Sequence, residues 1–559
     1  MDEGRRRDEL SSMLDRVFST ASKALEEGPP SIGPEEIGRV GEISKGVTRV
    51  SGLPGLGCEE LVFFEGGGLG LAFDLHPDEA AIVLLTKAEG LRSGMAVRRS
   101  GRKIDVPVGD RLLGRVIDPL GRPLDGGVSL EGGERLPIER EAPPIMARAS
   151  VSAPLQTGIV AVDALIPVGR GQRELIIGDR QIGKTAIALS AIENQGDSGV
   201  LCVYCSIGQQ STATAKVVAE LAATGALARS VVVVASGDEP PGLNFIAPYA
   251  AASIAEWFME RGRDSLVVFD DLSRHARSYR ELSLLMRRPP AREAYPGDIF
   301  YIHSRLLERA THLSPERGGG SMTALPIVET EAQNIAAYIP TNLVSITDGQ
   351  IYLAPKLFQE GRLPAIDIGL SVSRVGGKAQ VAAYAEIVGD LRIAYSQFEE
   401  LEMFERFSSR LDAATRASLE RGKRIREALR QDRADLVDLP AQIALLLAVT
   451  EGVFDAVPVG EMKIALEALR VELRGSLSEV ASSIASSGKL EKEARERILE
   501  GARRVAALRS PVAATPALAA ASAAAAASAA AATPALAAAA AAADAVPAKV
   551  PGPWNPLKP

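Results

Sequence analysis

Cysteine is scarce in this chain, whose 559 residues include three. So few thiols cannot form a disulfide framework, which suits a reducing compartment. Cys202 and Cys205 have the spacing of a CxxC redox or metal pair, but they stand within Val200–Ser206, which has the composition of a buried strand. Residues three apart on a strand point to opposite faces, roughly 10 Å apart, which is beyond disulfide reach. The pair therefore indicates core packing rather than redox chemistry.

The chain also lacks an excess of positive charge, an apolar leader and a long apolar run. Its 63 Lys and Arg residues against 71 Asp and Glu give a net charge of −8, which offers no general attraction for nucleic acid. The first residues carry no apolar segment typical of a signal peptide. The segment nearest to a membrane span, residues 517–533, is mostly alanine, a weak membrane anchor. We expect no nucleic-acid partner, and contact with a membrane only through other proteins.

Histidine is rare as well, and its positions share no spacing typical of metal ligands. We expect surface or hydrogen-bonded roles for His76, His275, His303 and His312. Trp257 stands in an apolar helical stretch and is expected in the core.

Three patterns of apolar residues divide the main part of the chain into three regions. Closely spaced β segments over residues 31–97 predict a small β-barrel. Over residues 98–380 apolar runs alternate with helical stretches, which is typical of an α/β domain with a mainly parallel sheet. Residues 381–508 carry apolar residues at helical spacing and predict an α-helical bundle. The runs expected to form the buried strands of the α/β domain are Glu174–Ile177, Val200–Ser206, Val231–Ala235, Leu266–Phe269 and Leu343–Ile346.

The two ends differ from these domains. Residues 1–30 contain an amphipathic helix, predicted over residues 8–27, whose pattern is compatible both with packing on its own domain and with binding a partner. Residues 509–559 are rich in alanine and proline, and Thr-Pro-Ala-Leu-Ala-Ala-Ala occurs at 515 and again at 533. Such a segment lacks large apolar side chains, so we expect a disordered tail.

The strongest motif follows the apolar run Leu175–Ile177. It matches G-x-x-x-x-G-K-T, a phosphate-binding loop, and consists of Gly178, Asp179, Arg180, Gln181, Ile182, Gly183, Lys184 and Thr185. In such a loop backbone N–H groups surround the phosphates, the Lys ammonium reaches the β and γ oxygens, and the Thr hydroxyl binds Mg²⁺. A helical pattern at residues 186–192 provides the required context. The sequence thus predicts a nucleoside triphosphate site.

Two carboxylates follow the predicted strand Leu266–Phe269. Ligand sites of α/β domains lie at the carboxyl ends of their strands. We expect Asp270 to assist the Mg²⁺ bound by Thr185, directly or through water, with Asp271 as the alternative.

Five segments together resemble one family, the α subunits of F-type rotary ATP synthases. The resemblance runs from about residue 8 to residue 450. It implies a β-barrel, an α/β nucleotide domain and a helical bundle, in a chain that alternates with β subunits in a three-plus-three ring around a central γ shaft. It also implies that the N-terminal helix contacts the peripheral stalk, at the cytoplasmic face of the bacterial inner membrane. The segments are the phosphate loop and residues 287–298, 303–310, 340–350 and 364–377, of which Pro364–Ser373 is similar to a signature of the α and β subunits.

Gln209 indicates which of the two sister subunits this chain resembles. In the family's β subunits a Glu that follows Gly after the next strand polarises the attacking water, whereas here Gln209 follows Gly208. An amide can hold a water but cannot accept its proton, so the local site lacks a general base. Gln181 is also similar to the α version. The resemblance thus implies a non-catalytic, regulatory subunit that binds Mg-ATP or Mg-ADP without turnover.

The same resemblance implies a role in trans for Arg374. In the family's α subunits, the segment similar to Ser371–Gly377 projects this arginine into the catalytic site of the neighbouring β subunit, with Ser371 and Ser373 beside it. An arginine finger aimed at the γ-phosphate is worth about 10³ to 10⁵ in rate. The activity implied for the complex is ATP synthesis or hydrolysis coupled to H⁺ or Na⁺ transport.

Several residues depart from the family pattern. Ile182 stands where Thr is usual. Near the adenine, Gln431 matches the family's Lys-Gln-x-Gln but Arg433 does not. The short connection at residues 318–321, with residues 330–334 and 399–402, resembles the alternate, sodium-associated bacterial branch.

Two other functions share such a nucleotide core. A self-sufficient, secretion-type hexameric ATPase would hydrolyse ATP by itself, and Gln209 argues against it. An RNA-translocating hexameric helicase is disfavoured by the acidic balance and by the helical C-terminal region.

Overall fold

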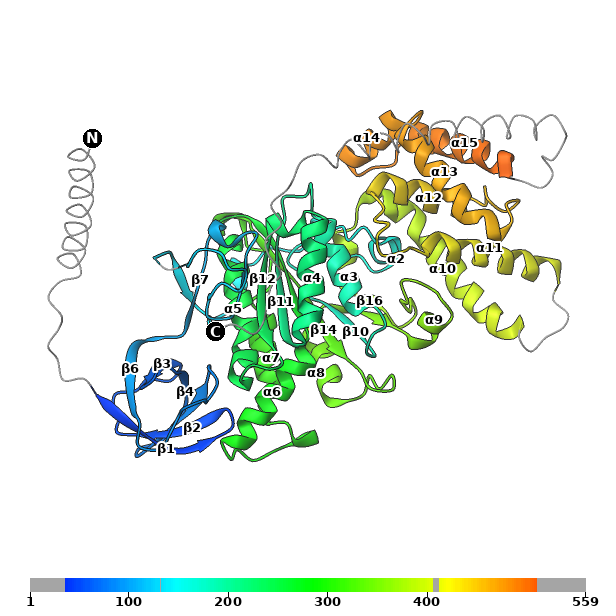
Figure 1. The fold of residues 1–559 in the computed structure, drawn as a ribbon. Coiled ribbons are helices and arrows are strands. Elements are labelled where there is room, and N and C mark those ends of the chain that lie inside the picture. The colour runs from blue at the N-terminus through cyan, green and yellow to red at the C-terminus, as the bar shows by residue number, and fades with distance from the viewer. Residues whose placement is uncertain (1–35, 131, 406–411, 510–559) are drawn as a thin grey trace, which may run out of the picture.

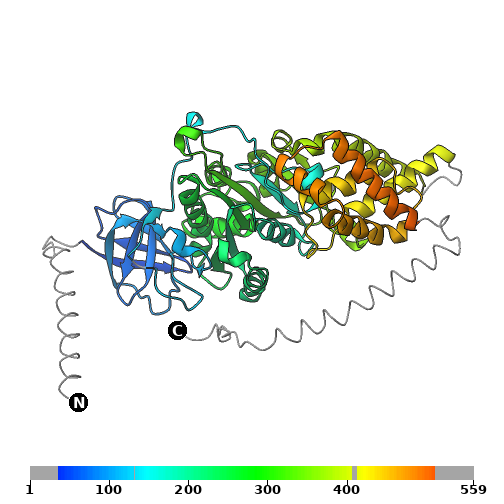
Figure 2. The same cartoon turned by 90° about the horizontal axis from the view of Figure 1, so that it is seen from above.

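A computed structural model of the chain describes residues 36–130, 132–405 and 412–509. The predicted N-terminal helix at residues 8–27 lies outside the described residues, and so does the tail predicted over residues 509–559, apart from Arg509. Figure 1 shows three parts in chain order, a small barrel, a central α/β domain and a helical region, and Figure 2 shows them in a row from above. The fold class predicted from the sequence is confirmed.

The first part is a closed barrel in which all neighbouring strands are antiparallel. Apolar side chains such as Val40, Val62 and Ile82 point inward and form its core. The last strand extends past residue 97, because Val97 fills the core while the strand continues along its neighbour β3. In barrel order the strands are β1 (Ile37–Ser44), β2 (Val47–Ser51), β5 (Ala80–Leu84), β4 (Leu69–Leu75), β3 (Glu60–Phe64) and β6 (Ala96–Lys103).

An eight-stranded sheet forms the centre of the second part. All its neighbouring pairs are parallel except the edge pair β15–β16. In sheet order the strands are β16 (Val372–Ser373), β15 (Gly349–Leu353), β10 (Glu174–Gly178), β14 (Ser321–Glu329), β13 (Asp264–Asp270), β11 (Leu201–Gln209), β12 (Ser230–Ser236) and β8 (Val116–Ile117). A separate pair joins β7 (Asp105–Pro107) to β9 (Arg135–Pro137).

One of the predicted strands was wrong. Leu343–Ile346 lies in helix α8 (Tyr338–Ile346), and the places in the sheet are taken by β14 and β15, which we did not predict. A short apolar run fits either structure. Pro340 stands in the first turn of α8, where no backbone N–H is needed, and the buried Ile339 and Leu343 are one helical turn apart.

Helices cover both faces of the sheet (Figure 1). One face packs on α3 and the other on α5, whose residues Gly242–Met259 are all buried. The helices of this part are α2 (Val160–Leu165), α3 (Lys184–Glu193), α4 (Ser211–Ala223), α5 (Pro241–Met259), α6 (Leu272–Leu285), α7 (Ile299–Leu307), α8 and α9 (Pro355–Gln359).

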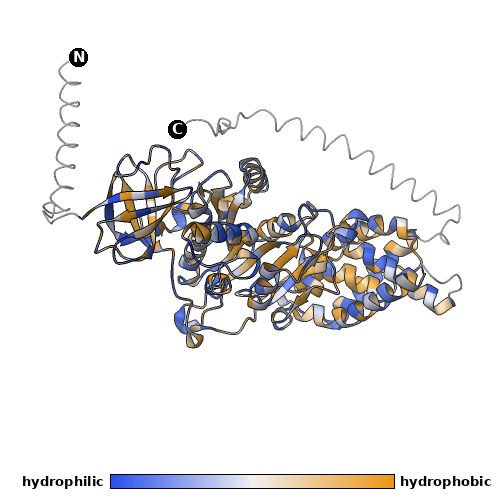
Figure 3. Cartoon of the chain, turned by 90° about the horizontal axis from the view of Figure 1, so that it is seen from below, coloured by the Kyte–Doolittle hydropathy of each residue, from blue (hydrophilic) through white to orange (hydrophobic). Residues whose placement is uncertain are grey.

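Strand β11 shows how the sheet separates two cores. Cys202 and Tyr204 belong to the core on the α3 face, while Val203 and Cys205 belong to the core on the α5 face. The two cysteines therefore lie on opposite faces, buried, as free thiols. In Figure 3 the strands at the centre of this part are mostly coloured as hydrophobic, whereas the outer helices carry both hydrophilic and hydrophobic residues. The core reading of the CxxC spacing agrees with this placement.

The third part is helical and shares one core with the α3 face of the sheet. The buried side chains of α12, from Ala441 to Val449, form its centre. Its helices are α10 (Ala382–Glu405), α11 (Ala413–Leu429), α12 (Leu439–Thr450), α13 (Met462–Arg474), α14 (Ser478–Ser487) and α15 (Lys492–Arg509).

Candidate functional site

The phosphate-binding loop connects β10 to α3 at the carboxyl end of the sheet. Gly183 has a φ of 104°, which favours glycine, and precedes the first helical residue. At Gly178 a Cβ would lie 2.7 Å from Ile182 Cδ1 and 2.8 Å from the carbonyl oxygen of Leu353, so the loop closes tightly on the sheet. The loop thus presents the free backbone N–H groups at the N-terminus of α3, where anions bind.

Lys184 is the first residue of α3 and is buried within the loop. Its ammonium donates to the carbonyl oxygen of Asp179, and burial lowers its pKa. The side chains of Asp179 and Arg180 are engaged on the outer side of the loop. The Asp179 carboxylate accepts from Thr330, and Arg180 pairs with Glu329 at 2.9 Å.

Asp270, at the end of β13, lies beside the first turn of α3. Its carboxylate accepts hydrogen bonds from the Thr185 hydroxyl at 2.7 Å, from the Tyr204 hydroxyl at 2.7 Å and from the Gln209 amide at 3.1 Å. Burial raises the pKa of Asp270. The structure thus joins Asp270 to Thr185, as expected, and adds Gln209, which the sequence analysis had selected for another reason. Tyr204 had not been selected, because nothing in the sequence showed which face of its strand meets Asp270.

Asp271 has a different role from its neighbour. Its carboxylate accepts the backbone N–H of Arg274 at 2.8 Å and caps helix α6. Burial, with Glu329 and Asp270 nearby, raises the pKa of Asp271 to about 7. Asp270 rather than Asp271 therefore contacts Thr185.

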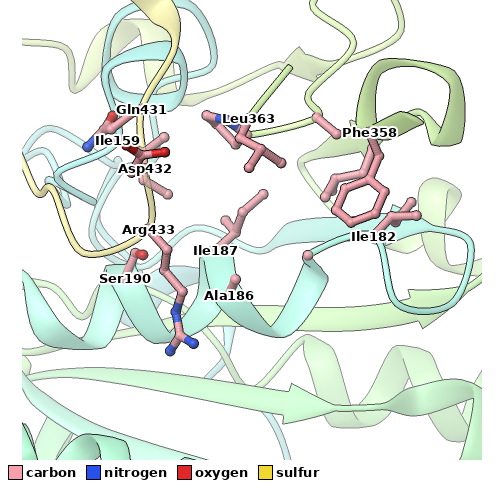
Figure 4. A pocket seen from close by; sticks show the side chains of 14 residues that line it. Ile159, Ile182, Ala186, Ile187, Ser190, Phe358, Leu363, Gln431, Asp432 and Arg433 are labelled. Carbon is pink, nitrogen blue, oxygen red and sulfur yellow. The ribbon is translucent and has the colours of Figure 1, made fainter. Parts of the chain in front are cut away.

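A pocket of about 220 Å³ extends from the loop towards the helical part. Figure 4 shows Phe358 beside Ile182 at one end, and Gln431 and Asp432 beside Ile159 at the other. Its walls are mostly apolar and include Ile187, Leu353, Leu363 and Pro364. Such a slot beside a phosphate loop fits the ribose and base of a nucleotide.

Arg374 lies away from this site. It follows β16, whose Ser373 pairs with Gly349 at the amino end of β15, whereas Gly178 of the phosphate loop pairs with Leu353 at the carboxyl end. Four residues of strand separate the two levels, about 13 Å at roughly 3.3 Å per residue. Arg374 is exposed, and its guanidinium contacts the carbonyl oxygen of Val344 at 3.4 Å.

Ser371 and Ser373 tie this segment to the sheet. The Ser371 hydroxyl donates to the carbonyl oxygen of Asp367 and accepts the Tyr352 N–H. The Ser373 hydroxyl donates to the carbonyl oxygen of Pro167 at 2.7 Å and accepts from the Gln172 amide at 3.1 Å. Both hydroxyls are bonded within the chain.

Two of the histidines meet in the core. His275 Nδ1 and His303 Nε2 lie 3.3 Å apart, and burial lowers the pKa of both, that of His303 to about 4. His312 is hydrogen-bonded to the carbonyl oxygen of Ser150, and His76 is exposed. Trp257 is buried and donates to Glu134. Within the described ranges, no cluster of three or more His, Cys, Asp or Glu side chains could hold a metal ion by itself.

No helix in the part of the chain that the structure describes is both long enough and apolar enough to cross a membrane.

Comparison with known proteins identifies two matching family models. Residues 158–373 match the nucleotide-binding domain of the ATP synthase alpha/beta family, and residues 380–505 match the C-terminal domain of the ATP synthase alpha/beta chain. The first match spans the phosphate loop and ends next to Arg374.

Curated relatives match most of the chain. ATP synthase subunit alpha 2 of Albidiferax ferrireducens is 58% identical over 496 residues, covering 89% of this chain and 93% of the relative. ATP synthase subunit alpha 1 of a Marinomonas species is 57% identical over 494 residues, covering 88% and 97%. ATP synthase subunit alpha 2 of Syntrophotalea carbinolica is 60% identical over 447 residues, covering 80% and 86%. The resemblance drawn from the motifs is confirmed over most of the chain.

Proposed function

The chain belongs to the ATP synthase alpha/beta family, and from this premise we propose that it is the non-catalytic α subunit of an F-type ATP synthase. It binds a magnesium–nucleotide complex in its own site and supplies Arg374 to the catalytic site of a neighbouring β subunit. The complex synthesises or hydrolyses ATP, coupled to ion transport through its membrane part.

The position of Arg374 carries this proposal. The residue is exposed and lies at the amino end of β15, whereas the phosphate loop is at the carboxyl end. Its side chain cannot span about 13 Å of strand to meet a γ-phosphate in its own site. An exposed guanidinium on an anchored segment suits a partner's site, and Ser371 and Ser373 hold that segment in place.

The surroundings of Gln209 support a site that holds nucleotide without hydrolysing it. Its amide donates to Asp270, whose carboxylate also accepts from Thr185 and Tyr204. An amide cannot accept the proton of an attacking water. Asp270 is buried among donors and is directed at Thr185, so the local site lacks a general base.

The residues beside the loop fit Mg²⁺. A threonine hydroxyl and a carboxylate are the oxygen ligands that this ion takes in phosphate-loop proteins, together with waters and phosphate oxygens. Thr185 and Asp270 would hold it, directly or through water. When bound, the ion neutralises charge on the β- and γ-phosphates, and Lys184 contributes the second positive charge.

The partners follow from the family assignment. The proposal includes alternating β subunits, a central γ shaft, and a peripheral stalk contacted by the N-terminal residues, with the complex at the cytoplasmic face of the inner membrane. Coupling to H⁺ or to Na⁺ is decided in the membrane part of the complex. The sodium-associated branch remains our reading of residues 318–321, 330–334 and 399–402.

Reconstitution with the cognate β and γ subunits tests this function. We expect the complex containing Arg374→Ala to lose about 10³-fold or more in ATP hydrolysis, while Mg-ATP binding by the isolated α chain stays unchanged. Lys184→Ala, by contrast, should abolish Mg-ATP binding by the isolated α chain. Unchanged hydrolysis with Arg374→Ala would refute the role in trans. Steady hydrolysis by the chain alone, abolished by Lys184→Ala, would support the self-sufficient ATPase instead.

A further inference from the structure

The end of the pocket farthest from Ile182 is where a bound nucleotide would place its base. Gln431, Asp432 and Arg433 form this end, at the junction with the helical part (Figure 4). Because the rest of the lining is mostly apolar, any choice between bases depends on these three residues. The inference below rests on the proposed function, since it concerns the base end of the same nucleotide site.

The Gln431 amide is already used within the chain. Its Nε2 donates to the carbonyl oxygens of Gly158 and Asp435, each at 2.6 Å, and its Oε1 accepts the Val160 N–H at 2.9 Å. The side chain is buried. Both amide hydrogens and the carbonyl oxygen are thus engaged in joining α2 to the segment after α11. Gln431 is a structural link and does not present its amide to a base.

The next two side chains are exposed and charged. Asp432 accepts from the Lys463 ammonium at 2.8 Å and therefore has a partner outside the pocket. Arg433 forms an ion pair with Glu220 of α4, and Figure 4 shows its side chain crossing α3 near Ser190. A guanidinium has five N–H donors and no acceptor. Arg433 can therefore donate to a base but cannot accept from it.

The two purines differ at the edge that such a group would meet. Adenine presents a donor at N6 beside the acceptor N7, and guanine presents acceptors at both O6 and N7. An amide, which donates and accepts, pairs with adenine, whereas a guanidinium pairs with guanine. With Gln431 engaged and arginine at 433, the pocket contains no side-chain amide that selects adenine.

We propose that the nucleotide site of this chain accepts guanine nucleotides as well as adenine nucleotides, and that Arg433 is the residue that determines this breadth. The apolar walls hold either purine by shape, and an apolar pocket discriminates weakly between ligands of similar size. The guanidinium crosses α3 to Glu220, so at the pocket Arg433 contributes no acceptor for the amino group of adenine, and its donors suit O6 and N7 of guanine once it is released from Glu220.

Titration calorimetry of the full-length chain with Mg-ATP and with Mg-GTP tests this proposal. We expect dissociation constants within about tenfold of each other. Arg433→Gln places a side-chain amide in the pocket, and the preference for Mg-ATP over Mg-GTP should rise by about tenfold or more. Arg430→Gln is the matched control, because Arg430 is exposed and does not line this pocket. It should leave the ratio unchanged.

A second variant tests the same residue without replacing it. Glu220→Gln removes the carboxylate that pairs with Arg433. The released guanidinium can then donate to guanine, so the affinity for Mg-GTP should rise relative to that for Mg-ATP. A wild-type preference for ATP above about a hundredfold, or a ratio that neither variant shifts, would overturn the inference and leave the nucleotide site intact. Failure of the wild-type chain to bind either nucleotide would instead overturn the proposed function, and the inference with it.

Discussion

Ile182 occupies the phosphate-loop position where the family usually has threonine, and the structure accounts for an apolar side chain there. It is 6% exposed and lies beside Phe358 at the wall of the pocket. Its Cδ1 approaches the backbone of Gly178, so its side chain packs against the loop. The buried isoleucine therefore stabilises the loop through its contact with Gly178.

Replacing Ile182 by threonine should affect stability more than affinity. Ile182→Thr replaces the buried ethyl branch of the side chain by a hydroxyl, which should destabilise the nucleotide domain by about 1–2 kcal/mol. Mg-ATP affinity should change by less than about fivefold, because backbone groups meet the phosphates. Chemical unfolding and calorimetry of the two chains measure these effects. A large loss of affinity with unchanged stability would contradict this account.

Asp271 should make the stability of the chain depend on pH. Its pKa is raised from 3.8 to about 7, so between these values the folded chain binds a proton that the unfolded chain lacks. Stability should therefore fall as pH rises through this window, by about 1.4 kcal/mol per pKa unit. Asp271→Asn keeps an oxygen to cap α6 and removes the titration.

Melting temperatures of wild type and Asp271→Asn, measured at several pH values, test this prediction. The melting temperature of Asp271→Asn, without nucleotide, should rise relative to wild type from about pH 5 to about pH 8. Asp125→Asn is the control, because pairing with Arg115 lowers the pKa of Asp125 to about 2, so this carboxyl is ionised in both states above about pH 5 and its difference from wild type should not change with pH. Parallel profiles for wild type and Asp271→Asn would show that Asp271 does not titrate in this range.

Single residues can be selected from the sequence where the chemistry is local in sequence. The eight residues of the phosphate loop and Asp270 after its strand follow from spacing alone, and the structure brings Asp270 to Thr185. The contacts of Gln431 could not be predicted, because two of its three partners, Gly158 and Val160, lie on segments far away in the sequence. Tyr204 was missed for the same reason.

Among the elements, the segment that carries Arg374 is held at several points. The Gly376 N–H donates to the Ser373 hydroxyl, and a Cβ at Gly376 would lie 1.7 Å from the carbonyl oxygen of Pro167. Arg173 pairs with Asp348 at 2.8 Å, and the Asp348 carbonyl oxygen accepts the Arg374 N–H. The backbone before and after Arg374 is thus fixed against the sheet.

Adjacent glycines allow a matched test of this anchoring. Gly376→Ala must displace the segment, whereas Gly377→Ala places its Cβ in open space. In the reconstituted complex Gly376→Ala should lower hydrolysis by on the order of 10²-fold, since an arginine moved by about 1 Å loses its alignment. Gly377→Ala should retain activity. Combined with Arg374→Ala, Gly376→Ala should add no further loss; an additive loss would show that it acts elsewhere.

At the scale of elements, the apolar runs predicted strands β10, β11, β12 and β13 of the central sheet but missed its other strands. The predicted strand Leu266–Phe269 corresponds to β13, and helices α10 to α15 lie within the predicted helical region at residues 381–508, apart from the last residue of α15. Leu343–Ile346 was assigned to a strand because a mainly apolar stretch of four residues contains too little sequence to show a helical period. Only the surrounding fold, with Pro340 in a first turn, distinguishes the two.

In the whole molecule, the barrel packs on the sheet domain through a cluster of aromatic rings. Phe73 of β4 meets Phe245 of α5 at 5.6 Å between ring centres, edge to face, and Tyr279 of α6 at 6.5 Å. Arg288 lies 5.1 Å above the Phe73 ring and pairs with Asp74 at 2.9 Å. These contacts join the first part of the chain to helices on the α5 face.

Removing the Phe73 ring should therefore loosen the barrel specifically. Phe73→Ala loses two aromatic contacts and a cation–π contact, about 1–3 kcal/mol in all. We expect faster hydrogen exchange in β1–β6, measured by mass spectrometry, and unchanged exchange in the nucleotide domain. Phe63→Ala is the control, because Phe63 is 43% exposed on β3. If both variants speed exchange in the barrel equally, the loss lies inside the barrel. If exchange is faster in Phe73→Ala alone, the ring cluster is the link between the two parts.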